Sequence, residues 1–182
     1  MSRVGRKKII IPDGVDVQIS GHNVEIKSQK GSAKFIMPEG ISAQISNNEI
    51  HVARCADSKS LRSLHGTTTR VIGNKIIGLS TGFKKVLEYK GVGFTATVDS
   101  GKLNLRIGFS HQVTVDIPES LSVSVVKNTI VIEGTNNELV GEFAAKVREL
   151  KKPEVYKGKG IKYQGEFIKK KAGKAAQTTA SS

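Results

Sequence analysis

Apolar and polar residues alternate with a period of two in a series of short stretches in both halves of the chain. This alternation predicts β-strands that each bury one face. The first half contains the stretches 15–19, 24–26, 33–37, 41–45 and 50–52. The second half contains the stretches 94–98, 103–107, 113–117, 121–125 and 130–132. Turn-forming pairs such as Asn47-Asn48 and Ser100-Gly101 separate neighbouring stretches, so we expect antiparallel hairpins.

Apolar residues recur at helical spacing after each set of predicted strands. In the second half they do so over 139–150, behind a capping pair of asparagines and ahead of Pro153, which ends the helix. In the first half Asp57 or Ser58 can cap a longer segment, 61–79. Its interior glycines each cost roughly 1 kcal/mol. We therefore expect this first helix to depend on tertiary packing.

The two halves share one pattern at a constant offset. Pro38-Glu39 matches Pro118-Glu119 at 118 − 38 = 80 residues, and the apolar positions that follow keep the same spacing. A repeat of this length is a complete folding unit. We predict an α+β fold of two duplicated domains, each a mainly antiparallel sheet with a helix packed on one face. The predicted segments are a domain 1–81 with a basic arm 1–8, a domain 82–174, and a disordered tail 175–182.

The net charge of the chain and its distribution indicate what kind of partner the protein binds. The 182-residue chain carries 29 Lys and Arg against 16 Asp and Glu, a net charge of +13, with a pI near 9.9. The segment 151–174 contains nine lysines and two glutamates, or 9 − 2 = +7, and the arm 1–8 contains four more basic residues. This clustering predicts a polyanionic partner. Nucleic acid is the first candidate and an anionic membrane surface the weaker one.

Several protein classes are excluded at this point. No apolar run approaches the roughly 20 residues of a membrane-spanning helix, so we do not expect an integral-membrane protein, and the leading hypothesis includes no membrane partner. One cysteine, Cys55, allows neither an internal disulfide nor a cysteine zinc site, which favours a cytosolic protein. The four histidines are scattered, and each is better explained as a satisfied or exposed residue than as a catalytic group. We expect no enzyme activity, metal, cofactor or small-molecule substrate.

The segment PEVYKGKGIKYQGEFIKKKAGK, residues 153–174, holds the clearest candidate for binding. Lys157 and Lys159 alternate with Gly158 and Gly160. Ammonium groups neutralise phosphates, and glycine lets the backbone approach a nucleic acid closely. The sequence therefore predicts a turn that acts as a cradle for a sugar-phosphate backbone.

The sequence leaves open the roles of the residues on either side of this turn. Tyr156 and Tyr163 flank it and could either lie against a ribose or base or pack into the core. Lys169, Lys170, Lys171 and Lys174 follow it on an extension that we expect to be weakly structured without a partner.

A second glycine-rich stretch, Lys90 to Phe94, fits neither of two nucleotide-binding patterns. A dinucleotide-binding loop must open a helix, whereas a strand is predicted after this stretch. The RNA-recognition-motif signature is missing two aromatic residues, at Val92 and Thr97. The chain has six Phe, three Tyr and no Trp, so we expect phosphate contact and shape to outweigh base stacking.

Four stretches together resemble one known family. They are the opening SRVGRKKIIIP, residues 82–93 (GFKKVLEYKGVG), residues 107–113 (IGFSHQV) and residues 153–174. They are similar to the bacterial form of large-subunit ribosomal protein six, over nearly the whole chain. The resemblance implies two duplicated α+β domains and binding to large-subunit rRNA. It also implies a position near the stalk base and the factor-binding sarcin-ricin region, beside neighbouring ribosomal proteins.

Carried over by position, the resemblance implies that 156–163 is the RNA-contacting element and that Ser110 and His111 lie in a loop near RNA. Lys162 stands where the family commonly has arginine, which keeps the charge but loses the planar fork. Val155 and Gln112 each stand where the family commonly has proline. With the charge clusters included, the expected rRNA-binding residues are Tyr156, Lys157, Gly158, Lys159, Gly160, Lys162, Tyr163, Lys169, Lys170, Lys171, Lys174, Ser110, His111, Arg3 and Lys7.

The leading hypothesis is a non-catalytic architectural protein that binds folded rRNA. The alternative is a cytosolic adaptor whose basic C-terminal segment binds an acidic protein or an anionic surface. An enzyme that acts on nucleic acid has the least support.

Overall fold

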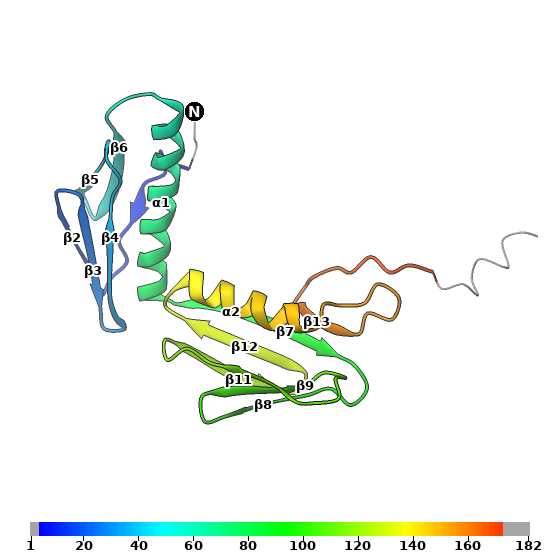
Figure 1. Cartoon of the computed structure of the whole chain (residues 1–182). Helices are drawn as coiled ribbons and strands as arrows, with labels where there is room; N and C mark the ends of the chain where they lie inside the picture. Colours follow the sequence, from blue (N-terminus) through cyan, green and yellow to red (C-terminus); the bar gives the residue numbers. More distant parts are fainter. Residues whose placement is uncertain (1–3, 173–182) are drawn as a thin grey trace, which may run out of the picture. The chain divides into compact units, whose positions relative to one another are not determined.

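The computed structural model describes residues 4–172 (Figure 1). Arg3, Lys174 and the predicted tail 175–182 lie outside the described residues. The chain forms two compact units. Unit 1 comprises Met1–Phe83 with Thr135–Asn137, and unit 2 comprises Lys84–Gly134 with Glu138–Ser182.

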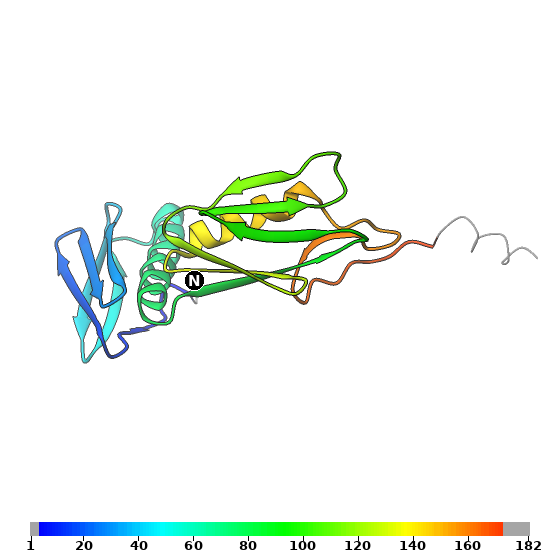
Figure 2. The ribbon, with the colours of Figure 1, turned by 90° about the horizontal axis from the view of Figure 1, so that it is seen from below.

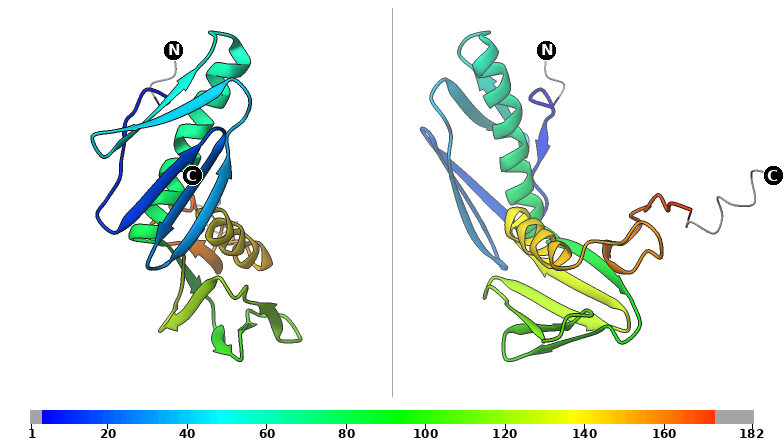
Figure 3. Two further views of the ribbon diagram at one scale, coloured as in Figure 1. Left: turned by 90° about the vertical axis from the view of Figure 1, so that its left-hand side faces the viewer. Right: turned by 45° about the vertical axis from the view of Figure 1, so that its right-hand side comes forward.

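Unit 1 contains two antiparallel sheets and one helix. Its elements are β1 (Ile9–Ile10), β2 (Val15–Ser20), β3 (Asn23–Ser28), β4 (Gly31–Ile36), β5 (Ile41–Ser46), β6 (Glu49–Arg54) and α1 (Lys59–Ser80). The sheet orders are β2-β3-β4 and β1-β6-β5. The helix α1 contacts strands of both sheets and lies along them (Figure 3, left). The core between them is aliphatic, with Val24, Ile26, Ile50, Ile72 and Ile76 at its centre.

The helix α1 forms despite its glycines because its N-terminus is capped and one face packs against the sheets. The Ser58 hydroxyl caps it by accepting a hydrogen bond from the Leu61 N–H at 3.1 Å. On the buried face His65 is held between the Val52 carbonyl, 2.9 Å from Nε2, and Arg54, 3.2 Å from Nδ1. A buried polar ring with both nitrogens partnered is a structural residue. The prediction of a satisfied histidine is confirmed at this position.

Unit 2 repeats this plan and extends it. Its elements are β7 (Phe83–Lys90), β8 (Thr95–Asp99), β9 (Lys102–Arg106), β10 (Val113–Asp116), β11 (Leu121–Val126), β12 (Thr129–Gly134), α2 (Asn137–Leu150) and β13 (Gly160–Tyr163). The sheet orders are β10-β9-β8 and β11-β12-β7-β13. Figures 1 and 2 show α2 lying across the four-stranded sheet, and its buried residues are Val140, Phe143, Ala144 and Val147.

The duplication predicted at an offset of 80 residues is visible in the strands. Adding 80 to the bounds of β5 gives 121–126, the bounds of β11, and adding 80 to those of β6 gives 129–134, the bounds of β12. The predicted α+β class is confirmed. Each repeat, however, divides its strands between two sheets. Pro38 and Pro118 lie in the connections where the division falls, and proline cannot donate to a strand ladder.

Three strands, β1, β7 and β13, were not predicted. β1 has only two residues, and the charged residues of β7 (FKKVLEYK) interrupt a period-two pattern. β13 has four residues inside a lysine-rich run. Neither helix in the described part of the chain has the length and apolar content needed to cross a bilayer.

Candidate nucleic-acid interface

The lysine-glycine segment forms a closed turn between α2 and β13, drawn in orange in Figure 3 (right). Hydrogen bonds within the chain fix its shape. The Glu154 N–H donates to the Lys159 carbonyl at 2.8 Å, and the Gly158 N–H donates to the Glu154 carbonyl at 3.0 Å. At its base the Ile161 N–H donates to the Lys151 carbonyl at 2.8 Å. The turn therefore has a defined shape before any partner binds.

The two glycines of the turn, Gly158 and Gly160, differ in the space around them. Gly158 has a φ of 69°, and a Cβ there would meet only the flexible end of Lys170, at 3.6 Å. Gly160 is buried with a φ of 139°, and a Cβ there would lie 2.7 Å from the Lys152 carbonyl oxygen and the Pro153 Cα. The close approach that Gly160 permits is therefore to the protein's own backbone.

Lys162 is engaged within the sheet. It lies opposite Glu88 in the β13–β7 pairing, and its Nζ is 3.2 Å from the Glu88 carboxylate. The two side chains are 33% and 34% exposed. A lysine paired in this way offers less free charge to a phosphate than an unpaired one. The neighbouring Lys157 is exposed and Lys159 is partly exposed.

The tyrosines that flank the turn have different environments. Tyr156 is 53% exposed and lies outside the core. Tyr163 is partly buried, and the Arg148 guanidinium lies 5.6 Å from the centre of its ring. That arrangement is a cation–π contact within the protein. Of the two tyrosines, only Tyr156 presents most of its side chain to solvent.

A groove brings the turn together with the glycine-rich stretch 91–94. It has a volume of about 330 Å³ and is lined by Tyr89, Lys90, Gly91, Val92, Phe94, Asn128, Lys157 and Lys159. Within residues 4–172 no carboxylate pairs with Lys90, Lys157 or Lys159. Three unneutralised ammonium groups beside a small-residue loop can hold a phosphate chain. Lys90 was not among the expected site residues, although its neighbouring glycines marked the stretch as unusual.

The loop with Ser110 and His111 lies beside the start of the same segment. The Lys151 ammonium is 4.9 Å from the centre of the Phe109 ring. The Phe109 and His111 rings stack, with centres 6.0 Å apart and an angle of 14° between their planes. Ser110 and His111 are both exposed. The structure thus brings 107–111, 151–159 and 90–94 together at one end of unit 2.

The extension after β13 folds back onto the turn instead of leaving it. The Arg148 guanidinium donates two hydrogen bonds to the Glu166 carboxylate, with the Nε–Oε2 distance 3.0 Å. This pairing lowers the pKa of Glu166, although partial burial acts in the opposite direction. Farther along, the Lys171 N–H donates to the Val155 carbonyl at 2.9 Å. The extension has no helix or strand as far as residue 172, in line with the expected weak structure, but these bonds hold it at two points, and the side chains of Lys169, Lys170 and Lys171 are exposed.

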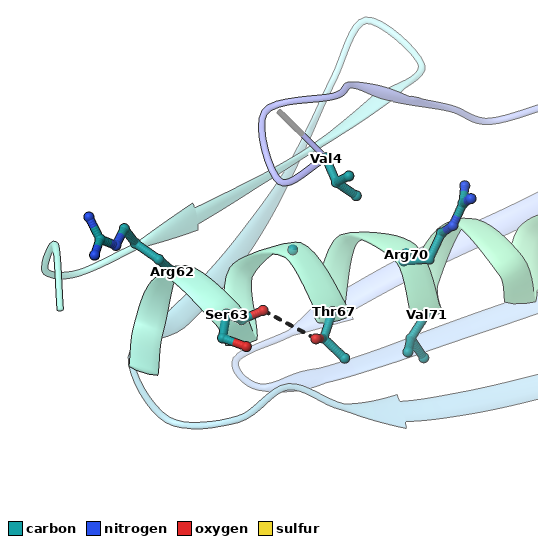
Figure 4. Close-up of a pocket in the computed structure, with 7 residues that line it drawn as sticks. Val4, Arg62, Ser63, Thr67, Arg70 and Val71 are labelled. Carbon is teal, nitrogen blue, oxygen red and sulfur yellow. Dashed lines mark hydrogen bonds between the residues drawn. The ribbon is translucent and has the colours of Figure 1, made fainter. Parts of the chain in front are cut away.

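Unit 1 has a basic surface of its own on α1. Arg62, Gly66 and Arg70 follow one another at intervals of four, which places them on one face of the helix. With Ser63, Thr67, Val71 and Val4 they line a groove of about 610 Å³ (Figure 4). Figure 4 shows both arginine side chains extending away from the helix. An adjoining groove is lined by Lys7 and Arg70, and no residue of α1 is acidic.

Among residues 4–172 no group of three or more His, Cys, Asp or Glu side chains is placed to hold a metal ion. The fold and the unpaired lysines are typical of α+β proteins that bind a polyanion through a rigid basic surface.

Comparison with known proteins identifies the family. The family model described as ribosomal protein L6 matches twice, over residues 11–82 and 90–164. A large ribosomal subunit protein uL6 from Akkermansia muciniphila is 51% identical over 176 residues, which cover 96% of this chain and 98% of that protein. The protein of the same name from Enterococcus faecalis is 42% identical over 178 residues, 97% of this chain and 100% of that protein. The chain belongs to the ribosomal protein L6 family, and the resemblance found in the sequence is confirmed.

Proposed function

We propose that the protein is a structural constituent of the large ribosomal subunit and binds large-subunit rRNA through one end of unit 2. The observation that carries the proposal is the groove in which Lys90, Lys157 and Lys159 meet without an acidic partner among the described residues. Its relatives are named as proteins of the large ribosomal subunit. A constituent of a ribonucleoprotein particle needs a surface of this kind.

Binding follows from the shape and charge of the turn. The hydrogen bonds of Glu154 and Lys159 hold the turn in place, so little conformational entropy is lost when RNA binds. The ammonium groups displace the counterions of the phosphates, which supplies an affinity that depends on salt and not on base sequence. Lys162 contributes mainly through its pair with Glu88, which joins β13 to the sheet. The lysines then position the protein on folded RNA, and they do not read its sequence.

Other expected residues provide additional contacts with rRNA in this proposal. Ser110, His111 and Tyr156 border the basic end of unit 2 and can contact sugar or phosphate. Lys7 and the arginines of α1 form a second basic surface, which favours a second contact with rRNA through unit 1. Arg3 and Lys174 remain candidates by sequence alone.

The proposed location is near the stalk base and the factor-binding region, with neighbouring ribosomal proteins as partners. This location derives from the sequence resemblance. The names of the relatives do not support the adaptor alternative. No catalytic role is proposed for a member of this ribosomal protein family.

The test is retention on purified large subunits during sedimentation through a high-salt cushion. A built-in constituent should stay with the subunit at one copy per particle, because charge pairs enclosed by folded RNA are screened by salt much less than exposed ones. A protein that only adheres by charge should be released, since salt screens exposed charges. Release at a salt concentration that leaves other constituents bound would overturn the proposal.

A further inference from the structure

Phe167 is the most exposed of the large apolar side chains in residues 4–172. Its side chain is 89% exposed, although phenylalanine is among the residues most often buried. It lies between Glu166 and the lysines of the extension, in a segment that has no role in the core.

The backbone around Phe167 is held at two points. On one side Glu166 is fixed by the Arg148 guanidinium, and it also accepts a hydrogen bond from the Tyr163 N–H at 2.9 Å. On the other side the Lys171 N–H donates to the Val155 carbonyl at 2.9 Å. The ring is therefore presented on a short loop between two anchors. A group held in this way loses little entropy when it binds.

The neighbours of the ring decide which partner it suits. Lys169, Lys170 and Lys171 are all exposed and follow Phe167 after the partly buried Ile168. Lysine is depleted from the centres of protein–protein interfaces, so an apolar pocket on a protein is a poor match. An aromatic ring beside several cations matches a nucleic acid, where a base stacks on the ring and the phosphates meet the ammonium groups.

We infer that Phe167 stacks on an unpaired base of the same rRNA that the lysines bind. This inference rests on the proposed function and adds a base contact to a site otherwise built on phosphate contacts. It is compatible with the expectation from composition that phosphate contact and shape outweigh base stacking, because it adds one stacking contact to a mainly electrostatic site. Single-stranded bases in loops and bulges are the RNA groups that stack on aromatic side chains.

The chain has three tyrosines and no tryptophan, so Phe167→Trp creates a single tryptophan whose emission can be excited separately from that of the tyrosines. The probe is deproteinised large-subunit rRNA from Akkermansia muciniphila, the source of one relative. Stacking on a base should quench the emission of this variant when the RNA is added. The matched control is Ile36→Trp, at a site in unit 1 that is 72% exposed, where no quenching is expected. Equal emission changes in the two variants would overturn the inference.

Affinity measurements separate stacking from simple apolar burial. Phe167→Leu should weaken binding by about 5- to 140-fold, because a base stacked on an aromatic ring contributes that much. Phe167→Tyr keeps the flat ring and should bind like the parent. Neither change alters charge, so the dependence of the affinity on salt should stay the same. RNA binding by Phe167→Leu as tight as that of the parent would show that no base stacks on the ring and would overturn the inference.

The outcomes also separate this inference from the proposed function. A parent protein without salt-dependent RNA affinity would overturn both. If the parent has that affinity but RNA does not quench the emission of Phe167→Trp, only the stacking contact is overturned. Because Phe167 is exposed, all variants should unfold at the temperature of the parent, and a thermal melt checks this.

Discussion

The double variant Lys157→Ala/Lys159→Ala tests the basic groove of unit 2. Both lysines line that groove, and neither has an acidic partner among residues 4–172. The matched control is Lys27→Ala/Lys34→Ala in unit 1, whose ammonium groups lie 3.8 and 2.8 Å from the Glu25 carboxylate. Each double variant lowers the net charge equally, from +13 to 13 − 2 = +11. Any difference between them therefore reflects position and not total charge.

The size of the effect follows from the number of phosphates neutralised. Six of the lysines of unit 2 that have no acidic partner among the described residues line the groove or lie on the extension, and all are exposed or partly exposed: Lys90, Lys157, Lys159, Lys169, Lys170 and Lys171. If each meets one phosphate, log K falls with log salt at a slope of about −4.2 to −5.4. With two lysines removed the slope should become about −2.8 to −3.6. The control should keep the slope of the parent.

Filter binding of deproteinised large-subunit rRNA over a range of salt concentrations measures these slopes. The unfolding free energy should change little in either variant, because exposed charges contribute little to stability. Chemical denaturation checks that point. The reasoning is refuted if the groove variant keeps the parent's slope, or if the control lowers the slope by the same amount.

Three further predictions concern the turn, the extension and α1. Gly160→Ala should cost more unfolding free energy than the roughly 1–2 kcal/mol expected for Gly165→Ala. Both have positive φ, but only at Gly160 would a Cβ meet backbone atoms; equal losses in urea denaturation would contradict this. The hydrogen bonds from Arg148 lower the pKa of Glu166 in the folded protein below its ordinary pKa of 4.5. The pairing therefore stabilises the fold above pH 4.5, and this stabilisation is lost as the pH falls through the lower pKa of the folded state. Glu166→Gln should therefore flatten the acid side of the stability profile, measured by denaturation between about pH 6 and 3, and an unchanged profile argues against the pairing. Arg62→Gln/Arg70→Gln should lower the salt slope of rRNA binding by about 1.4 to 1.8, and no change would remove α1 from the interface.

Features that depend on near neighbours in the chain were predictable. The alternation in Val24 and Ile26 marked β3, and the same alternation recurred 80 residues later in the second repeat. The first helix could be placed from its cap and its apolar spacing, and Ser58 fills the capping position. The lysine-glycine segment stood out by composition. Each of these signals lies within one element or one turn, where propensity and periodicity act.

Features that depend on pairing across the chain were not predictable. Lys162 seemed free in the sequence, but β13 pairs with β7 and places it opposite Glu88. Gly160 suggested access for RNA, but its open side faces the backbone of Lys152. Lys90 joined the groove only because the turn closed beside it, 157 − 90 = 67 residues away from Lys157.

The sequence by itself determined most of the strands, both helices, the duplication and the location of most of the positive charge. These follow from local periodicity and residue type, which act over a few neighbouring positions. The tertiary structure alone decided which lysines stay unpaired, which glycine faces inward and which aromatic ring faces solvent. Those outcomes depend on burial and on strand register between distant segments, and no local pattern contains that information.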